Sequence, residues 1–328
     1  MCKVVLIFRK PYSSSISIEY LFKAISTDLQ KKIEVKEYTV PFFSTGLLNR
    51  LINTLSLLRF KGRTVHVTGD IYYTILGALS SNRIITIHDL SFLYRTSGLA
   101  RSILKLFWVT LPVKFSHKVV AISNATKQEI LKEVNIPTQK IIVIPDFIDP
   151  IYKPVKRSFN TNNPRILQVG VSFNKNIERL IAALVDIKCT LVIIGKLTEA
   201  QSQLLLEKDI NFENYSNLSI EMLYNEYSKA DMLSFVSTVE GFGMPILEAQ
   251  ASALPVVTSN CSSMGEVAGN GAVLVDPFTV NSIRDGILQV INDDLLRESI
   301  IKAGLENVKV YSREQVVEEY IKLYQSFN

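Results

Sequence analysis

The sequence predicts an α/β protein of two doubly wound domains, each a parallel sheet covered by helices. A chain of 328 residues is long for one domain and sufficient for two. Short apolar runs alternate with longer helical patterns, as they do in βα units. The alternation stops once, in residues 149–164, which are rich in Pro, Asn and charge, and then restarts. This interruption is expected to be an interdomain linker.

The first half of the chain contains six apolar runs of strand length, separated by helical patterns. A sheet covered on both faces is expected, so these runs are interpreted as buried strands. Ser123 or Asn124 is expected to cap the last helix of this half. The expected strands are residues 4–8, 35–40, 64–67, 83–87, 118–122 and 141–144, and the expected helices are residues 16–29, 47–59, 101–115 and 125–134.

The second half repeats the pattern with five further apolar runs. Helices are expected after most of these strands, and a last helix is expected over residues 314–326. The expected strands are residues 165–169, 190–194, 232–236, 255–258 and 272–275.

The bulk composition is that of a globular protein and excludes several other classes. The chain is 47% hydrophobic and 20% charged, and no repeat or low-complexity tract is evident. A net charge of +5 permits attraction to phosphate or anionic lipid without indicating nucleic acid. Cys2, Cys189 and Cys261 are widely spaced, which indicates reduced thiols in a cytosolic protein. The apolar run near Met1 is too short for a signal peptide, and no run reaches the roughly 18 apolar residues of a spanning helix.

A glycine-bearing turn follows the expected strand at residues 232–236. Gly241 and Gly243 lie on the turn, and Pro245 suits the first position of a helix that ends near Leu254. Such a turn presents unpaired backbone N–H groups at the positive end of a helix dipole, an arrangement that suits a phosphate.

Two carboxylates flank this turn. Glu248 lies about one turn into the helix and can accept hydrogen bonds from a vicinal diol such as a ribose, while Glu240 lies on the turn. A diphosphate on the turn and a ribose on Glu248 would make a nucleotide site. The alternative is that the glycines serve only the turn and that Glu248 stabilises the helix through its dipole.

The longer segment Glu240-Gly-Phe-Gly-Met-Pro-Ile-Leu-Glu248, continued by residues 254–260 and 265–269, resembles the donor-site signature of the family 4 glycosyltransferases. These are retaining enzymes of the GT-B fold that use nucleotide sugars. The family pattern has two glutamates at this spacing, and this chain has both. Residues 85–93, 121–127, 140–145 and 165–176 are similar to further stretches of the same family.

The resemblance implies two Rossmann-like domains that face each other across a cleft. Residues 1–155 would form the acceptor-side domain, and residues 160–311 would form the nucleotide-sugar donor domain. The last helix, about residues 312–328, would cross back onto the first domain.

The resemblance also implies the site residues. His88 would contact the donor sugar or phosphate from the carboxyl end of a strand, although a His that only caps the strand end is the alternative. Lys175 would neutralise the leaving diphosphate, and Glu240 would hold the sugar hydroxyls. Donor-binding positions would be Gly170, Asn174, Lys175, Gly241, Phe242, Gly243, Met244, Pro245, Ile246 and Glu248.

The chain departs from the family pattern at two places. The family often has Arg-Lys-Asn where this chain has Asn174-Lys175-Asn176, so Lys175 is expected to neutralise the diphosphate alone or with Lys196. The alternative for Lys196 is that it is only a solvated charge on a loop. The family often has a Gly-Gly turn after the first strand, where this chain has residues 9–15. Ser hydroxyls and backbone N–H groups of that segment are expected to take its place.

Metal binding is not expected. Asp293 and Asp294 form the only adjacent pair of aspartates and are expected to cap or solvate a helix, and Glu266 is expected to have a structural role at a strand end. Paired carboxylates also occur in glycosidases, but here they are divided between sugar and ribose, which argues against hydrolysis.

Two segments suggest contact with a membrane surface. Residues 47–63 and 99–118, the latter with Trp108, combine large apolar residues with Arg and Lys. Such segments can lie on an anionic bilayer, and the alternative is that each is an amphipathic helix covering its own core.

The function expected from the resemblance is retaining, metal-independent transfer of a hexose from a nucleotide diphosphate sugar, without a cofactor. The context of Ser91-Phe92-Leu93 favours mannose from GDP-mannose and a glycan or lipid-linked acceptor in cell-surface polysaccharide synthesis, in the cytoplasm or at the inner face of the membrane. A non-catalytic nucleotide-sugar-binding partner in a glycan assembly complex is the alternative. An epimerase of the same fold would need further acid or base groups that the sequence does not reveal.

Overall fold

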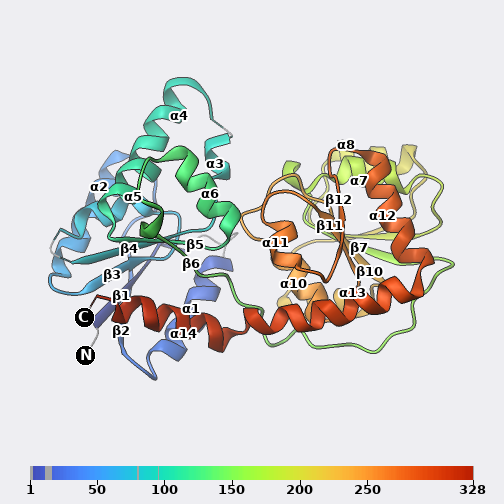
Figure 1. Cartoon of the computed structure of the whole chain (residues 1–328). Coiled ribbons are helices and arrows are strands. Elements are labelled where there is room, and N and C mark those ends of the chain that lie inside the picture. Colours follow the sequence, from blue (N-terminus) through green and yellow to red (C-terminus); the bar gives the residue numbers. More distant parts are fainter. Residues whose placement is uncertain (1–2, 12–16, 80, 95, 328) are drawn as a thin grey trace. The chain divides into compact units, whose positions relative to one another are not determined.

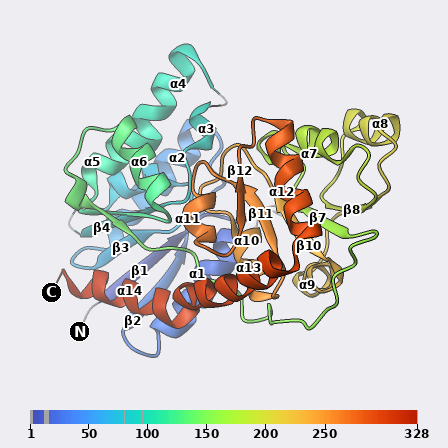
Figure 2. The same ribbon diagram turned by 45° about the vertical axis from the view of Figure 1, so that its right-hand side comes forward.

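The computed structural model describes residues 3–11, 17–79, 81–94 and 96–327, and it divides into two compact units. Unit 1 comprises Met1–Phe147 and Arg313–Asn328, and unit 2 comprises Ile148–Ser312. Each unit is a six-stranded parallel sheet with helices on both faces, which confirms the predicted α/β class (Figure 1 and Figure 2). The interdomain linker expected at residues 149–164 lies at the beginning of unit 2, directly after this division.

The sheet of unit 1 has the strand order β2-β1-β3-β4-β5-β6. Its strands are β1 (Lys3–Phe8), β2 (Glu34–Thr39), β3 (Thr64–Val67), β4 (Asn82–Ile87), β5 (Lys118–Ala121) and β6 (Ile141–Val143). Its helices are α1 (Ser17–Leu29), α2 (Leu47–Leu55), α3 (Ser91–Tyr94), α4 (Gly98–Leu104), α5 (Leu111–Phe115), α6 (Asn124–Glu133) and α14 (Arg313–Gln325), with the 3-10 helices η1 (Ser56–Arg59), η2 (Tyr72–Gly77) and η4 (Thr138–Lys140) and the π-helix η3 (Lys105–Thr110).

The sheet of unit 2 has the strand order β12-β11-β10-β7-β8-β9. Its strands are β7 (Arg165–Val169), β8 (Thr190–Ile194), β9 (Phe212–Tyr215), β10 (Met232–Phe235), β11 (Val256–Ser259) and β12 (Val273–Val275). Its helices are α7 (Ile177–Leu184), α8 (Glu199–Glu207), α9 (Ile220–Lys229), α10 (Met244–Ala251), α11 (Met264–Ala268), α12 (Val280–Asn292) and α13 (Asp294–Asn307), with the 3-10 helices η5 (Phe173–Lys175) and η6 (Val308–Tyr311).

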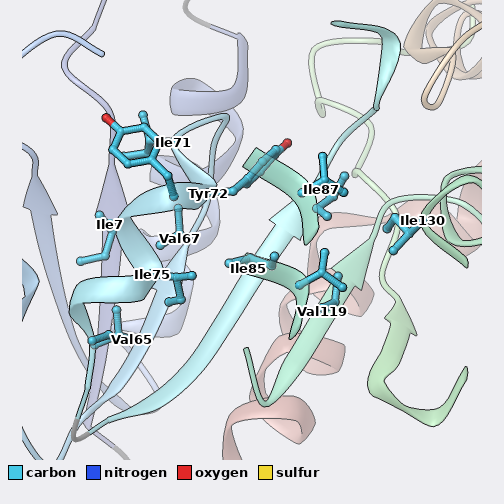
Figure 3. Packing of buried hydrophobic residues seen from close by; sticks show 14 of the residues in the cluster. Ile7, Val65, Val67, Ile71, Tyr72, Ile75, Ile85, Ile87, Val119 and Ile130 are labelled. Carbon is cyan, nitrogen blue, oxygen red and sulfur yellow. The ribbon is translucent and has the colours of Figure 1, made fainter. Parts of the chain in front are cut away.

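Successive residues of the central strands point to opposite faces of the sheet and fill two separate cores. In unit 1 one face carries Ile7, Val67 and Ile85, which pack with η2 and α6 (Figure 3). The other face carries Leu6 and Ile84, which pack against α1 and α14. Burial on both faces explains why these strands are continuous apolar runs in the sequence.

The expected strands of the sequence are confirmed to within one or two residues at their ends, and Ser123 is confirmed as the cap of α6 because its hydroxyl accepts from Thr126 N. Strand β9 was missed. It pairs with β8 at the edge of its sheet, and its exposed or half-buried residues, Phe212–Tyr215, lack an apolar pattern. The prediction of one continuous α-helix over residues 101–115 is wrong, because the π-helix η3 interrupts it.

Helix α14 is joined to unit 1 through a buried polar cluster. The ring of His66 on β3 contacts Tyr324 Oη of α14 at 2.7 Å and Thr86 Oγ1 of β4 at 2.7 Å. Burial lowers the pKa of His66 to about 3, so the ring is neutral at physiological pH. Within the described residues, no helix combines the length and the apolar character needed to cross a membrane.

Candidate functional site

The loops that follow β7 and β10 meet at the carboxyl edge of the unit 2 sheet. Thr238 N donates to Asn174 O at 2.8 Å, which joins the two loops through their backbones. Because β7 and β10 are parallel neighbours, both loops leave the sheet at the same edge, where ligands of open α/β sheets gather. The predicted residues Asn174, Lys175 and Glu240 are brought together here.

Lys175 and Glu240 form a partly buried ion pair. Lys175 Nζ lies 2.7 Å from Glu240 Oε1, and the two side chains are only 17% and 15% exposed. Asn174 Nδ2 donates to the same oxygen at 3.1 Å. The ammonium group also lies 4.4 Å above the ring centre of Phe235, the last residue of β10. Lys175 and Asn174 therefore hold the Glu240 carboxylate by donating to it, and the Phe235 ring holds the Lys175 ammonium group.

Gly170 explains how Lys175 reaches this position. It has a φ of +90°, a conformation that L side chains rarely adopt, and a Cβ there would lie 2.8 Å from Lys175 Cε. A glycine is therefore required for the lysine stem to lie across the end of β7.

Asn176 fastens the same loop to two others. Its φ is +58°, and its amide Nδ2 donates to Val236 O at 3.0 Å and to Pro277 O at 2.7 Å. Its Oδ1 accepts from Arg179 at 2.8 Å, and the side chain is buried.

We expect Asn176→Ala to lower the free energy of unfolding by about 3 kcal/mol, because two buried carbonyls lose their donor and alanine is strained at this φ. Asn217→Ala is the matched control, since Asn217 has a similar φ of +56° but an exposed side chain. Urea unfolding followed by circular dichroism measures both variants. Equal losses in the two would show that the amide hydrogen bonds contribute nothing.

The turn Gly241–Gly243 leads into α10, as predicted. Gly243 precedes the helix with a φ of +113°, and Pro245 is its second residue rather than its first. The helix ends at Ala251, slightly before the expected end near Leu254. Phe242 and Ile246 have buried side chains, so any role in binding falls to their backbone groups. Met244 is half-buried.

Serines after β11 support this turn, and the sequence did not indicate them. Ser262 Oγ donates to Glu240 O at 2.7 Å and accepts from Glu240 N at 3.2 Å. Ser263 Oγ donates to Phe242 O at 2.7 Å. Ser262, in the segment after β11, therefore fixes the backbone of Glu240, and this limits the directions in which the Glu240 carboxylate can point.

Glu248 lies on α10 beside two tyrosines. Tyr227 Oη of α9 donates to Glu248 Oε2 at 2.6 Å. Burial raises the pKa of Glu248, and hydrogen bonds from Tyr227 and Tyr152 and the charge of Lys175 offset part of that rise. Tyr152 and Tyr227 pack edge to face with ring centres 5.4 Å apart. The carboxylate can accept hydrogen bonds from a diol, and the tyrosines orient it.

His88 lies in unit 1, after β4, and is buried. Its Nε2 lies 3.1 Å from Thr68 O, so this nitrogen carries the proton, and its Nδ1 lies 3.9 Å from Asp146 Oδ2. Burial alone would lower the pKa of His88, but Asp146, the Thr68 carbonyl and Asp89 together raise it. Both ring nitrogens face acceptors, which stabilise the charged imidazolium and account for the raised pKa.

The sequence also singled out Lys196, Glu266 and Asp293. Lys196 and Glu266 are exposed. Asp293 caps α13 by accepting from Leu296 N at 2.9 Å, as expected. In the part of the chain that the structure describes, no group of three His, Cys, Asp or Glu could hold a metal ion. The expected serine substitute for the Gly-Gly turn lies largely outside the described residues.

A pocket lies in unit 1. It has a volume of about 290 Å³ and combines apolar walls with charged groups. Arg9 donates to Asp70 Oδ2 at 2.8 Å at one side of it. The lining residues are Arg9, Lys10, Ser44, Asp70, Phe92, Leu104 and Trp108.

Comparison with known sequences covers both units. The model described as Glycosyltransferase Family 4 matches residues 34–151, and that described as Glycosyl transferases group 1 matches residues 153–307. The O-antigen chain mannosyltransferase RfbU of Salmonella typhimurium is 30% identical over 223 residues, which cover 65% of this chain and 62% of RfbU. The O-antigen chain mannosyltransferase B of Escherichia coli is 40% identical over 98 residues, which cover 30% of this chain and 26% of that protein. The chain thus matches less than two thirds of the length of either relative.

Solved structures with the same architecture align over nearly the whole chain. Anabaena HepE, in complex with UDP and glucose, has a TM-score of 0.78 at 17% identity and covers 99% of this chain and 100% of its own. WaaG, a glycosyltransferase involved in lipopolysaccharide biosynthesis, has a TM-score of 0.72 at 15% identity, covering 98% and 99%. Together with the two family models, this shared fold shows that the chain belongs to the family 4-like glycosyltransferases, which have the GT-B fold.

Proposed function

We propose that the chain transfers a hexose, with retention and without a metal ion, from a nucleotide diphosphate sugar to a glycan or lipid-linked acceptor hydroxyl. The observation that carries this proposal is the cluster of Lys175, Asn174 and Glu240 beside the glycine turn that starts α10. A cation, an anion and a helix N-terminus at one sheet edge meet the three needs of a sugar diphosphate: charge neutralisation, hydroxyl recognition and phosphate binding.

In this proposal each residue has a separate part. The donor diphosphate binds the N-terminus of α10 and Lys175, the sugar hydroxyls donate to Glu240, and the ribose hydroxyls donate to Glu248. The bond between the anomeric carbon and the phosphate oxygen breaks while the acceptor oxygen bonds to that carbon on the same face. The acceptor proton passes to the departing diphosphate, so no separate base is needed.

The proposed donor is GDP-mannose, and the proposed setting is cell-surface polysaccharide synthesis in the cytoplasm or at the inner face of the membrane. Similarity to two O-antigen chain mannosyltransferases supports the sugar and the setting. The unit 1 pocket beside Trp108 is the proposed place for the acceptor.

The test is a panel of UDP-, GDP- and dTDP-sugars, scored for thermal stabilisation and for slow nucleotide release. We expect GDP-mannose to stabilise the protein by about 2.7 kcal/mol at about 100 times its Kd. We also expect GDP release that Glu240→Ala abolishes. Stabilisation without release, with lipid-linked and glycan acceptors supplied, would favour a non-catalytic binding partner. No stabilisation by any donor would overturn the nucleotide site.

A further inference from the structure

Helix α2 presents its leucines to solvent and its polar residues to the protein. Leu47 is 84% exposed, and Leu48, Leu51 and Leu55 are each more than half exposed. Asn53, in contrast, is completely buried. A helix that covers its own core has the opposite arrangement. We call the outward surface the leucine face, made of Leu47, Leu48, Leu51, Leu55 and the part-exposed Leu58 of η1.

Hydrogen bonds of Asn53 hold the helix in this orientation. Its Oδ1 accepts from Phe42 N at 3.0 Å, and its Nδ2 donates to Phe42 O at 2.9 Å and to Tyr73 Oη at 3.4 Å. Turning the leucines inward would bury them at the cost of these bonds and would expose Asn53. The outward leucines are therefore part of the fold, because the inward polar contacts are specific.

More apolar surface lies beside the leucine face. The guanidinium carbon of Arg50 on α2 lies 4.6 Å from the ring centre of Trp108 on η3, so the two segments are in contact. Helix α4 has no buried residue, and it extends beyond the sheet of unit 1 (Figure 1 and Figure 2). The exposed large apolar residues of this neighbouring segment and of the chain before α2 are Phe42, Phe43, Leu99, Ile103, Leu106 and Phe107.

The chain segments that form this surface carry charges of one sign only. The chain has no Asp or Glu between Glu37 and Asp70, and it is also free of them between Asp89 and Glu129. Arg59 and Lys61 are exposed and follow the leucine face in the chain, and the guanidinium of Arg59 lies 5.3 Å from the ring centre of Tyr38 on β2. Other cations are already paired: Arg101 and Lys105 lie within 2.9 Å of Glu133. An apolar face whose own segments supply cations and no anions complements a layer of anionic lipid. It does not complement a second copy of itself, which would bring like charges together.

We propose that the leucine face binds the surface of an anionic lipid bilayer, with the leucines at the level of the acyl chains and Arg59 and Lys61 at the phosphates. The inference goes beyond the transfer reaction and does not depend on it. It also favours the membrane-surface interpretation of residues 47–63, because a helix that covered its core would not expose these leucines.

The test is flotation of the full chain with vesicles of phosphatidylcholine alone and of phosphatidylcholine with phosphatidylglycerol. We expect binding to the anionic vesicles, and we expect Leu47→Ser with Leu51→Ser to reduce the partition coefficient at least about tenfold. Arg59→Gln with Lys61→Gln should reduce it about fivefold for each cation removed, and only on the anionic vesicles.

The matched control is Leu206→Ser with Leu295→Ser, two leucines of unit 2 that are 71% and 79% exposed. Equal losses in the control and in the leucine-face variant would overturn the proposal, and so would a wild-type protein that does not float. Sedimentation of the protein without lipid adds a second criterion. If the wild-type protein is a dimer and the leucine-face variant is a monomer, the leucine face mediates self-association, and the proposal is overturned. Donor stabilisation should be unchanged in every variant, so failure here and failure of the proposed transfer are distinguishable.

Discussion

Replacing Glu240 by Gln is expected to lower kcat for mannose transfer by about a hundredfold to a thousandfold, and Lys175→Met should have an effect of similar size. Each substitution removes a charge that the proposed reaction needs at the sugar or at the leaving diphosphate. Because Lys175 Nζ and Glu240 Oε1 are 2.7 Å apart, the two effects should not add. The double variant is therefore expected to be little worse than the poorer single variant. Steady-state kinetics with radiolabelled GDP-mannose measures all three.

Lys196→Met is the control for Lys175→Met. Lys196 also follows a strand at the carboxyl edge of the unit 2 sheet, but it is exposed. We expect its loss to change kcat less than about twofold, as for a solvated charge. A loss as large as that of Lys175→Met would instead show that the two lysines share the neutralisation of the diphosphate. A fully active Glu240→Gln enzyme would exclude the proposed role of that carboxylate.

Glu248→Ala is expected to weaken donor binding by about ten- to a hundredfold, with a smaller effect on the rate at saturating donor. Ribose hydroxyls would lose a charged acceptor, and such hydrogen bonds contribute about 1.5–3 kcal/mol. Glu199→Ala is the matched control, because Glu199 also lies on a unit 2 helix and is exposed. If both substitutions weakened donor binding equally, the effect of Glu248→Ala would come from lower protein stability and not from a lost contact with the ribose. Calorimetric titration with GDP separates these outcomes.

The same carboxylate predicts a pH dependence. Its pKa is raised above the ordinary value of 4.5, mainly by burial, and the ionised form accepts the ribose bonds. Donor affinity should therefore be complete above the raised pKa and be lost as pH falls through it. Tyr227→Phe removes a hydrogen bond that lowers this pKa, so the loss should begin at higher pH in that variant. Calorimetric titrations across the acidic range test this, and identical profiles in both proteins would contradict it.

Several features were predictable because they depend on local pattern. The strands β1 and β8 are buried on both faces, so each appears in the sequence as a nearly continuous apolar run. The turn before α10 was recognised because Gly241, Gly243 and Pro245 each have a backbone preference that needs no partner. Strand β9 was missed for the opposite reason: it owes its conformation to pairing with β8, a partner that its own residues do not reveal.

By itself, therefore, the sequence determined the α/β class, the positions of most strands and the candidate residues at their ends. Only the tertiary structure decided which of those residues meet. Lys175 and Glu240 are 65 positions apart and form a pair because β7 and β10 are neighbours in the sheet. The position of the Glu248 carboxylate likewise depends on Tyr227, 21 positions away, and the outward leucines of α2 depend on Asn53, which bonds Tyr73, 20 positions away. Backbone preference acts over a few residues and can be recognised along the chain, whereas hydrogen bonds and packing between distant segments exist only once the sheet has formed.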